Sequence, residues 1–248
     1  ITYTTSMDCF KDADLVNESI VENMEIKHEF WKKVAAIARP DAILTTDTSG
    51  MSITKIAEAV TNPERFGGMH WLNPPHLVPL IEIIKGDLTS DETADLIYKV
   101  SQNVGKVPVI CKKDVPGFIT NRMQFAMMRE CFHLVEDGIA SAEDVDKTMK
   151  YGFGFRWAFI GPYQTCDFGG VDTFYRIASY LFKDLSTMQE PPVMMKELFE
   201  SGAYGVKAKK GWYDYPDGKD VTITKYRDEC FIKHADFLLE MDKKYGLR

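Results

Sequence analysis

The chain has 248 residues, of which 45% are hydrophobic and 12% aromatic, so it can bury the core of one large domain or two smaller ones. Its formal net charge of −7 argues against a nucleic-acid partner, because a phosphate backbone favours a basic surface. No apolar run approaches the ~18 residues that span a bilayer, and no signal-peptide pattern opens the chain. The five cysteines are scattered, without C-x-x-C spacing, which favours a reduced cytoplasmic protein with no zinc site or disulfide framework.

Residues 1–112 alternate strand and helix patterns. Strands are predicted at residues 1–5, 13–20, 41–49, 66–72, 77–84 and 107–112. Helices are predicted between them, at residues 21–38, 52–60 and 91–105, with Ser52 or Thr54 and Thr89-Ser90 available as N-caps. Strands that alternate with helices indicate βαβ units and a largely parallel sheet.

The pattern becomes helical after residues 114–117, Asp-Val-Pro-Gly. Helices are predicted at residues 118–138, 141–152, 168–183, 190–201 and 222–245, and no convincing strand follows residue 112. The predicted fold class is therefore α/β plus all-α, with an α/β domain over residues 1–112 and a helical domain over residues 113–248. The last helix is amphipathic and has to pack on its own body or on a partner chain.

The stretch of residues 66–84 carries the first candidate site. His70 ends one predicted strand, and Glu82 stands among aliphatic residues in the next. If these strands pair, the two side chains lie side by side, and a histidine backed by a carboxylate is an oriented general base. A buried carboxylate needs a partner, since leaving it unpaired costs several kcal/mol. The alternatives are a core histidine bonded to a carbonyl and an ion pair between Glu82 and Lys85 or another base.

Polar residues elsewhere extend this candidate site. Ser49 follows the predicted strand 41–49, and ligands of open α/β sheets bind at the carboxyl ends of strands, although Ser49 could also cap the next helix. Asn121 lies one turn into the first long helix, next to the domain boundary where substrates usually bind, or it is a surface residue. Asn73 is a common turn residue whose amide could also bind a carboxamide or a hydroxyl.

Several familiar motifs are missing from the sequence. Residues 151–161 contain Gly-x-Gly, but Trp157 takes the place of the third glycine and a helix precedes it, so we expect an irregular connection. No phosphate loop, zinc-protease or serine-hydrolase motif is present, and we expect no metal site. The remaining histidines are interpreted as structural or solvent-facing: His28, His76, His133 and His234.

Five motifs, in order and spacing, resemble the 3-hydroxyacyl-CoA dehydrogenase family, including the bacterial 3-hydroxybutyryl-CoA dehydrogenases. They are ADLVNESIVENMEIK (13–27), TTDTSGMSIT (45–54), ERFGGMHWLNPPHLVPLIEII (64–84), DVPGFITNR (114–122) and GVKAKKGWYDYP (205–216). The resemblance implies an NAD-dependent oxidoreductase of fatty acid metabolism. It also implies that residues 1–112 are the C-terminal part of an NAD-binding Rossmann domain and that residues 113–248 form a helical substrate and dimerisation domain.

The resemblance also implies roles for the matching residues. His70 would be the general base, Glu82 would hold it, and the substrate hydroxyl would bond to Ser49 and Asn121. The residues implied near the nicotinamide end of NAD are Glu22, Lys27, Ser49 and Asn73. The family's first strands and its G-x-G-x-x-G loop would lie upstream of Ile1, so we expect an N-terminally truncated chain that by itself binds NAD weakly or not at all.

Two departures and two alternatives accompany this resemblance. Asp47 stands where the family usually has Asn, and Gly50 where it has a second Ser. Pro75-His76 and residues 156–170 resemble a neighbouring branch that oxidises free 3-hydroxy acids, such as gulonate or carnitine dehydrogenases. A crystallin-like or remnant structural protein is the non-enzymatic alternative. The expected partners are a small-molecule substrate and a second copy of the chain, without nucleic acid or membrane.

Overall fold

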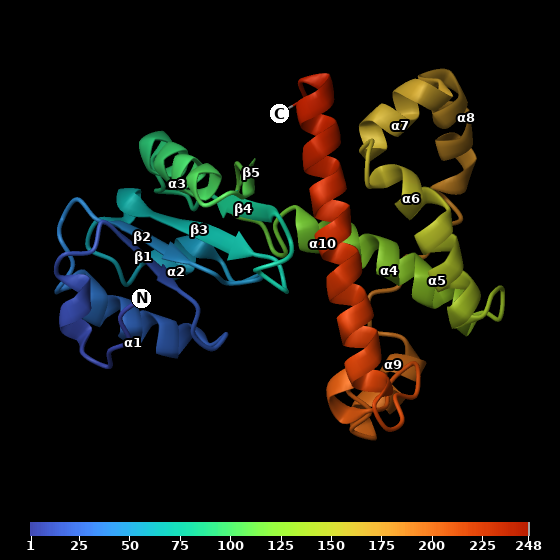
Figure 1. Cartoon of the computed structure of the whole chain (residues 1–248), viewed down its shortest axis with the longest axis horizontal. Coiled ribbons are helices and arrows are strands. Elements are labelled where there is room, and N and C mark those ends of the chain that lie inside the picture. The colour runs from blue at the N-terminus through green and yellow to red at the C-terminus, as the bar shows by residue number, and fades with distance from the viewer. Residues whose placement is uncertain (248) are drawn as a thin grey trace. The chain divides into compact units, whose positions relative to one another are not determined.

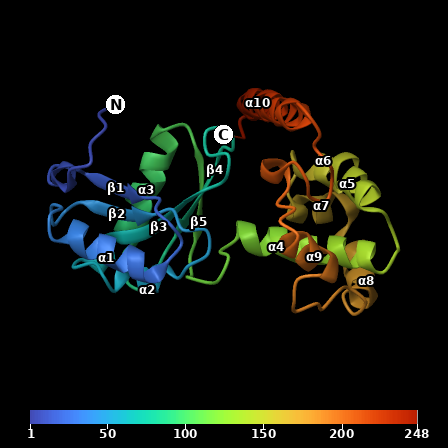
Figure 2. The same ribbon diagram turned by 90° about the horizontal axis from the view of Figure 1, so that it is seen from below.

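The computed structural model describes residues 1–247 and divides into two compact units, Ile1–Gln124 and Phe125–Arg248. The first unit holds a five-stranded sheet with helices, and the second is helical (Figures 1 and 2). The predicted fold class, α/β followed by all-α, is confirmed. The division falls inside a long helix, whose first residues belong to the α/β unit.

The sheet of the first unit follows chain order, β1-β2-β3-β4-β5. Its strands are β1 (Leu15–Glu18), β2 (Ile43–Thr46), β3 (Phe66–Trp71), β4 (Leu80–Ile84) and β5 (Val107–Cys111). All neighbouring strands pair in parallel except β3 and β4, which are antiparallel. The carboxyl ends of β1, β2 and β3 therefore meet at one edge of the sheet, as parallel strands require.

Helices cover both faces of this sheet (Figure 1). On one face α1 (Met24–Ala35) and α2 (Ile53–Ala57) bury Trp31 and Ile53 in the larger core. On the other face α3 (Asp91–Asn103) buries Ile97 against alternate residues of β3 and β4. Each helix begins at a polar cap, and the side chains that accept the capping N–H are those of Asn23, Ser52 and Ser90.

The strand predicted at residues 1–5 is wrong. These residues are exposed and have no strand partner among residues 1–247, and a short 3-10 turn, Met7–Phe10, follows them. The Ser6 hydroxyl accepts the amide N–H of Asp8 and so starts this turn. A β-branched run forms a strand only where a neighbouring strand satisfies its backbone, and the sheet begins with β1.

The second unit consists of helices, joined by short loops as far as α8 and by longer connections on either side of α9 (Figure 2). They are α4 (Thr120–Glu136), α5 (Ala142–Tyr151), α6 (Phe153–Trp157), α7 (Pro162–Gly169), α8 (Val171–Leu181), α9 (Val193–Glu200) and α10 (Lys219–Tyr245). The expectation of an irregular connection at residues 151–161 is wrong, because the chain forms the short helix α6 directly after Gly152. The helix predicted at residues 168–183 is interrupted at Gly170, whose φ of 88° lies in a region that glycine tolerates.

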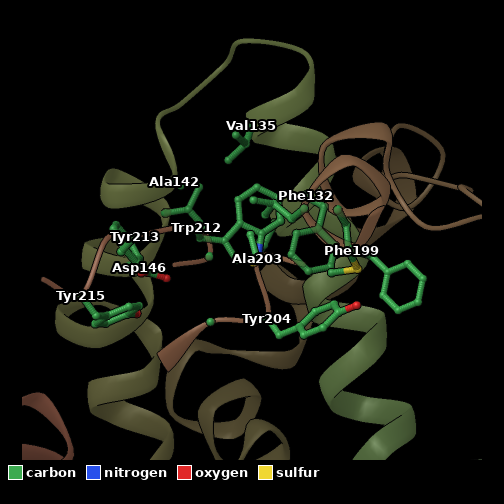
Figure 3. A pocket seen from close by; sticks show the side chains of 16 residues that line it. Phe132, Val135, Ala142, Asp146, Phe199, Ala203, Tyr204, Trp212, Tyr213 and Tyr215 are labelled. Carbon is green, nitrogen blue, oxygen red and sulfur yellow. The ribbon is translucent and has the colours of Figure 1, made fainter. Parts of the chain in front are cut away.

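An apolar cavity of about 510 Å³ lies in the second unit, lined by α4, α5, α9 and the segment 205–216 (Figure 3). The rings of Phe132 and Trp212 stack beside it, with centroids 5.8 Å apart and planes at 11°. The Tyr213 hydroxyl donates to Asp146 at 2.6 Å, and this bond together with burial raises the pKa of Tyr213 to about 12. The aromatic residues of the segment therefore fasten it to α4 and α5.

The helices of the second unit keep much of their apolar surface exposed. No residue of α8, α9 or α10 is buried, and α10 exposes aliphatic and aromatic side chains along its length. Among residues 1–247, none of the helices combines the length and the apolar character that a bilayer span requires.

Candidate active site

His70 and Glu82 form a buried pair at the centre of the candidate site. β3 and β4 are antiparallel, and their register places His70 directly opposite Glu82. The Nδ1 atom of His70 lies 2.8 Å from Oε2 of Glu82, with the histidine 5% exposed and the glutamate fully buried. The sequence-based expectation that these two side chains lie side by side is met by this register.

Glu82 is held in its ionised form by further donors. Its Oε1 accepts the amide N–H of Ile119 at 3.0 Å and that of Thr120 at 2.8 Å, at the start of α4. Burial raises the pKa of Glu82, but the hydrogen bonds from His70 and Thr120 outweigh burial, so the pKa lies below its ordinary value. An ionised Glu82 only accepts hydrogen bonds, which assigns the proton of neutral His70 to Nδ1 and leaves Nε2 as an acceptor.

A strained turn completes the surroundings of His70. The ring of Phe118 packs edge-on against His70, with centroids 5.8 Å apart, and is 1% exposed. Phe118 has a φ of 51°, unusual for a bulky residue, and Gly117 before it has a φ of 76°. This turn aims the start of α4 at Glu82 and closes the apolar side of the imidazole.

Three of the other predicted site residues are joined by hydrogen bonds. The side-chain amide of Asn121 donates to the carbonyl oxygen of Ser49 at 2.7 Å, and the amide N–H of Ser49 donates to Oε1 of Glu22 at 2.7 Å. The Thr48 hydroxyl also bonds to Glu22, at 2.9 Å. Glu22 and Ser49 are exposed, so this connected set lies open to a ligand at the carboxyl edge of the sheet. Asn121 belongs to the first unit, together with the others.

The sequence reasoning missed the buried partner of Lys27. The Lys27 ammonium donates to Oε1 of Glu18 at 2.7 Å, and both side chains are 1% exposed or less. Thr46 donates to the other oxygen of Glu18 at 2.7 Å, while Glu22 lies 3.6 Å from the ammonium. The sequence does place a glutamate at the end of the strand Leu-Val-Asn-Glu, and a buried glutamate indicates a nearby cation. Asn73, in contrast, is exposed beside a cis peptide bond to Pro74.

The site thus combines an oriented histidine base with carboxylate, amide and hydroxyl groups at the carboxyl edge of an α/β sheet, an arrangement that fits proton abstraction from an alcohol. Family models agree with it. The model described as "3-hydroxyacyl-CoA dehydrogenase, NAD binding domain" matches residues 1–115, and "3-hydroxyacyl-CoA dehydrogenase, C-terminal domain" matches residues 117–215. The chain belongs to the 3-hydroxyacyl-CoA dehydrogenase family, and it is an NAD-dependent oxidoreductase.

Individual relatives place the chain within this family. It is 35% identical over 216 residues to a 3-hydroxybutyryl-CoA dehydrogenase of Clostridioides difficile, covering 87% of this chain and 75% of the relative. It is 31% identical over 247 residues to an L-carnitine dehydrogenase of Pseudomonas putida, covering 98% and 75%. The solved structure of 5-formyl-3-hydroxy-2-methylpyridine 4-carboxylic acid 5-dehydrogenase superposes with a TM-score of 0.91 at 35% identity, covering 94% of this chain and 75% of that one.

The polar side chains at the sheet edge have hydrogen-bonding groups that fit one end of NAD. Exposed Glu22 can accept hydrogen bonds from ribose hydroxyls, and exposed Asn73 offers an amide of the kind that pairs with a carboxamide. Lys27 is already paired with Glu18, so it does not provide a free cation for phosphate groups. These residues therefore suit the polar nicotinamide and ribose end of the cofactor.

Proposed function

We propose that the protein oxidises the 3-hydroxyl of a 3-hydroxyacyl-CoA to a 3-oxo group, and catalyses the reverse reduction. His70 is the general base, and Glu82 is the carboxylate that orients it. The observation that carries this proposal is the buried His70–Glu82 contact of 2.8 Å, with the second Glu82 oxygen bonded to the start of α4. Such a pair fixes the tautomer of the base before substrate arrives.

The proton and the hydride leave the substrate toward different acceptors. Nε2 of His70 takes the hydroxyl proton, so the O–H bond breaks and an N–H bond forms while Nδ1–H stays bonded to Glu82. When bound, NAD⁺ would supply the acceptor for the hydride that leaves C3. The alcohol is thereby oxidised to a ketone, and the imidazolium returns its proton to solvent. Glu82 stabilises the positive charge on His70 throughout.

The neighbouring polar residues position the substrate and the cofactor in this proposal. Ser49 and Asn121 bind the substrate oxygen, and their mutual hydrogen bond holds them in place. Glu22, Asn73 and Ser49 lie toward the nicotinamide end. Lys27 also serves that end, acting through Glu22, which is 3.6 Å from its ammonium.

Replacement of His70 by Gln tests the proposal. We expect turnover in the protein to fall by about 10²- to 10⁴-fold, the contribution of a positioned general base, while the fold stays intact. Steady-state kinetics with acetoacetyl-CoA and NADH measure the loss, and circular dichroism checks the fold. His76→Gln, at an exposed histidine, is the matched control and should keep its activity. Turnover that survives in His70→Gln would refute the assignment of the base.

A second candidate is a dehydrogenase of a free 3-hydroxy acid. It is favoured by the similarity to L-carnitine dehydrogenase over 98% of the chain, which includes α10, and by the TM-score of 0.91 to a pyridine-carboxylic-acid dehydrogenase. The base and its chemistry stay the same, and only the substrate changes. Parallel assays with acetoacetyl-CoA and with free 3-oxo acids separate the two, because the correct substrate should show the higher kcat/KM.

We also propose that the protein is a cytoplasmic homodimer whose residues 113–248 bind substrate and the second copy, while residues 1–112 are the C-terminal part of the NAD-binding domain. The exposed apolar side chains of α8, α9 and α10 support a second copy as the partner. The end of the last strand, β5, at Cys111 supports the division between the two parts.

A further inference from the structure

Asp47 joins the ends of three strands beside the proposed base. It is the first residue after β2, and its Oδ1 accepts the amide N–H of Trp71 at 2.7 Å on the β3 side. Its Oδ2 accepts the Ser19 hydroxyl at 3.0 Å on the β1 side, and its own amide N–H donates to the carbonyl oxygen of Glu18 at 2.7 Å. The carboxylate thus holds together the carboxyl ends of β1, β2 and β3.

The bond to Trp71 bears directly on His70, the preceding residue. β2 and β3 are parallel, with Thr46 opposite Gly68, so the chain that leaves β2 runs beside the end of β3. Asp47 fixes the backbone of β3 from the β2 side, whereas Glu82 bonds the imidazole from β4. A carboxylate on each side of β3 is therefore bonded either to His70 or to the residue that follows it.

Asp47 and His70 also interact electrostatically. Burial raises the pKa of the half-buried Asp47 carboxyl and Glu18 adds to the rise, while the bonds from Trp71 and Ser19 and a positive charge on His70 lower it. Glu18 is itself paired with Lys27 at 2.7 Å, which limits its effect. A protonated His70 is therefore stabilised by Asp47 as well as by Glu82.

We propose that Asp47 is a positioning residue of this site, which fixes the backbone beside His70 and favours the positive charge that the imidazole carries after it accepts a proton. The proposal rests on the role of His70 as the base. Asp47 does not touch the reacting atoms, and it acts through its charge and through its hydrogen bond to the Trp71 backbone.

Replacement of Asp47 by Asn isolates the charge. An asparagine can still accept the Trp71 N–H and can bond to the Ser19 hydroxyl, so the geometry is kept. Steady-state kinetics should show a kcat lower by roughly 3- to 10-fold with KM unchanged, the fold-change that loss of one nearby charge produces. Asp95→Asn, which removes the same charge from an exposed position on α3, should leave kcat unchanged. An unchanged kcat in Asp47→Asn would overturn the proposal.

A second measurement covers the case in which Asp47→Asn does not fold. A positive charge on His70 lowers the pKa of Asp47, so His70→Gln should raise the pH at which Asp47 titrates, as followed by ¹³C NMR of its carboxyl. No change there would overturn the proposal equally. Turnover of His70→Gln distinguishes the proposed base from the proposed role of Asp47. An active His70→Gln refutes His70 as the base. An inactive His70→Gln in which the titration of Asp47 is unchanged refutes only the role of Asp47.

Discussion

At the scale of the residue, Glu82 has two tasks that a single carboxylate can perform together. One oxygen holds His70 in the tautomer that leaves Nε2 free, and the other accepts two amide N–H groups at the start of α4. These bonds allow full burial of the charge, because three donors of the protein replace water around the carboxylate. The base is thus oriented by the same residue that connects the sheet to the helix.

Glu82→Gln should inactivate the protein and change its response to acid. The Gln amide would donate to Nδ1 and move the proton of His70 to Nε2, so turnover should fall by about 10²- to 10⁴-fold. Because the folded-state pKa of Glu82 is lowered, its stabilising contribution is present above pH about 4.5 and is lost as pH falls through the lower folded value. Thermal unfolding of wild type should therefore show a melting temperature that falls between pH 7 and pH 3, and this fall should be smaller in Glu82→Gln.

Glu58→Gln, at an exposed glutamate after α2, is the control for this prediction. It should keep both the turnover and the acid-dependent loss of stability of wild type. An acid profile of Glu82→Gln that matches wild type would contradict the assigned charge state.

Lys27 is the second residue whose environment leads to a prediction. Lys27→Met leaves Glu18 buried without its cation, so the free energy of unfolding should fall by about 3–5 kcal/mol. The double variant Glu18→Gln/Lys27→Met should recover most of the loss, because no buried charge remains. Urea denaturation measures both. Lys33→Met breaks an exposed pair with Glu29 and should leave the free energy of unfolding close to that of wild type. Equal losses in Lys27→Met and Lys33→Met would contradict this account.

At the scale of the element, β3 depends on close packing between α2 and β4. A Cβ atom on Gly68 would lie 2.9 Å from Ile53 Cδ1 and 2.9 Å from Ile84 Cβ, and the latter cannot rotate away. The glycine therefore lets β3 approach its neighbours and places His70, two residues further on the same face, opposite Glu82.

Gly68→Ala should test this packing. The added methyl group should destabilise the protein by about 1–3 kcal/mol through overpacking and reduce turnover, because β3 shifts relative to β4. Urea denaturation and steady-state kinetics measure the two effects. Gly50→Ala is the stability control, since its Cβ would meet only the Gly117 nitrogen, at 3.9 Å. A Gly68→Ala protein as stable as wild type would show that the sheet relaxes freely.

At the scale of the whole molecule, the two units differ in how completely they bury their apolar residues. The first unit has cores on both faces of its sheet, whereas α8, α9 and α10 of the second unit contain no buried residue. Exposed apolar surface of this extent marks an interaction face. The second unit is therefore the part of the chain that we expect to meet a second copy.

Sedimentation equilibrium should give twice the chain mass of 28.3 kDa. Ile232 and Leu239 are exposed one heptad apart on α10, so Ile232→Asp/Leu239→Asp should shift the protein toward the monomer. Lys233→Asp, at the neighbouring exposed position, should leave the mass unchanged. A wild-type protein that sediments as a monomer at micromolar concentration would contradict the proposed dimer.

The sequence by itself determined the order of the elements and the core of the site. The strand and helix periodicities of its apolar residues predict β1 to β5, the helices between them and the helical second part. Ser52 and Ser90 act as the predicted caps. His70 and Glu82 could be paired from sequence because two short strands joined by a Pro-rich turn have few registers that bury both side chains.

Only the tertiary structure decided the interactions that join distant segments. The two backbone donors to Glu82 come from residues 37 and 38 positions further along the chain, and Asp47 bonds to Trp71 across 24 positions. The absence of a strand at residues 1–5 and the break at Gly170 also depend on neighbours and backbone angles rather than on local preference. Burial decides these features, because a charge or backbone group withdrawn from water takes whichever partner the fold brings close.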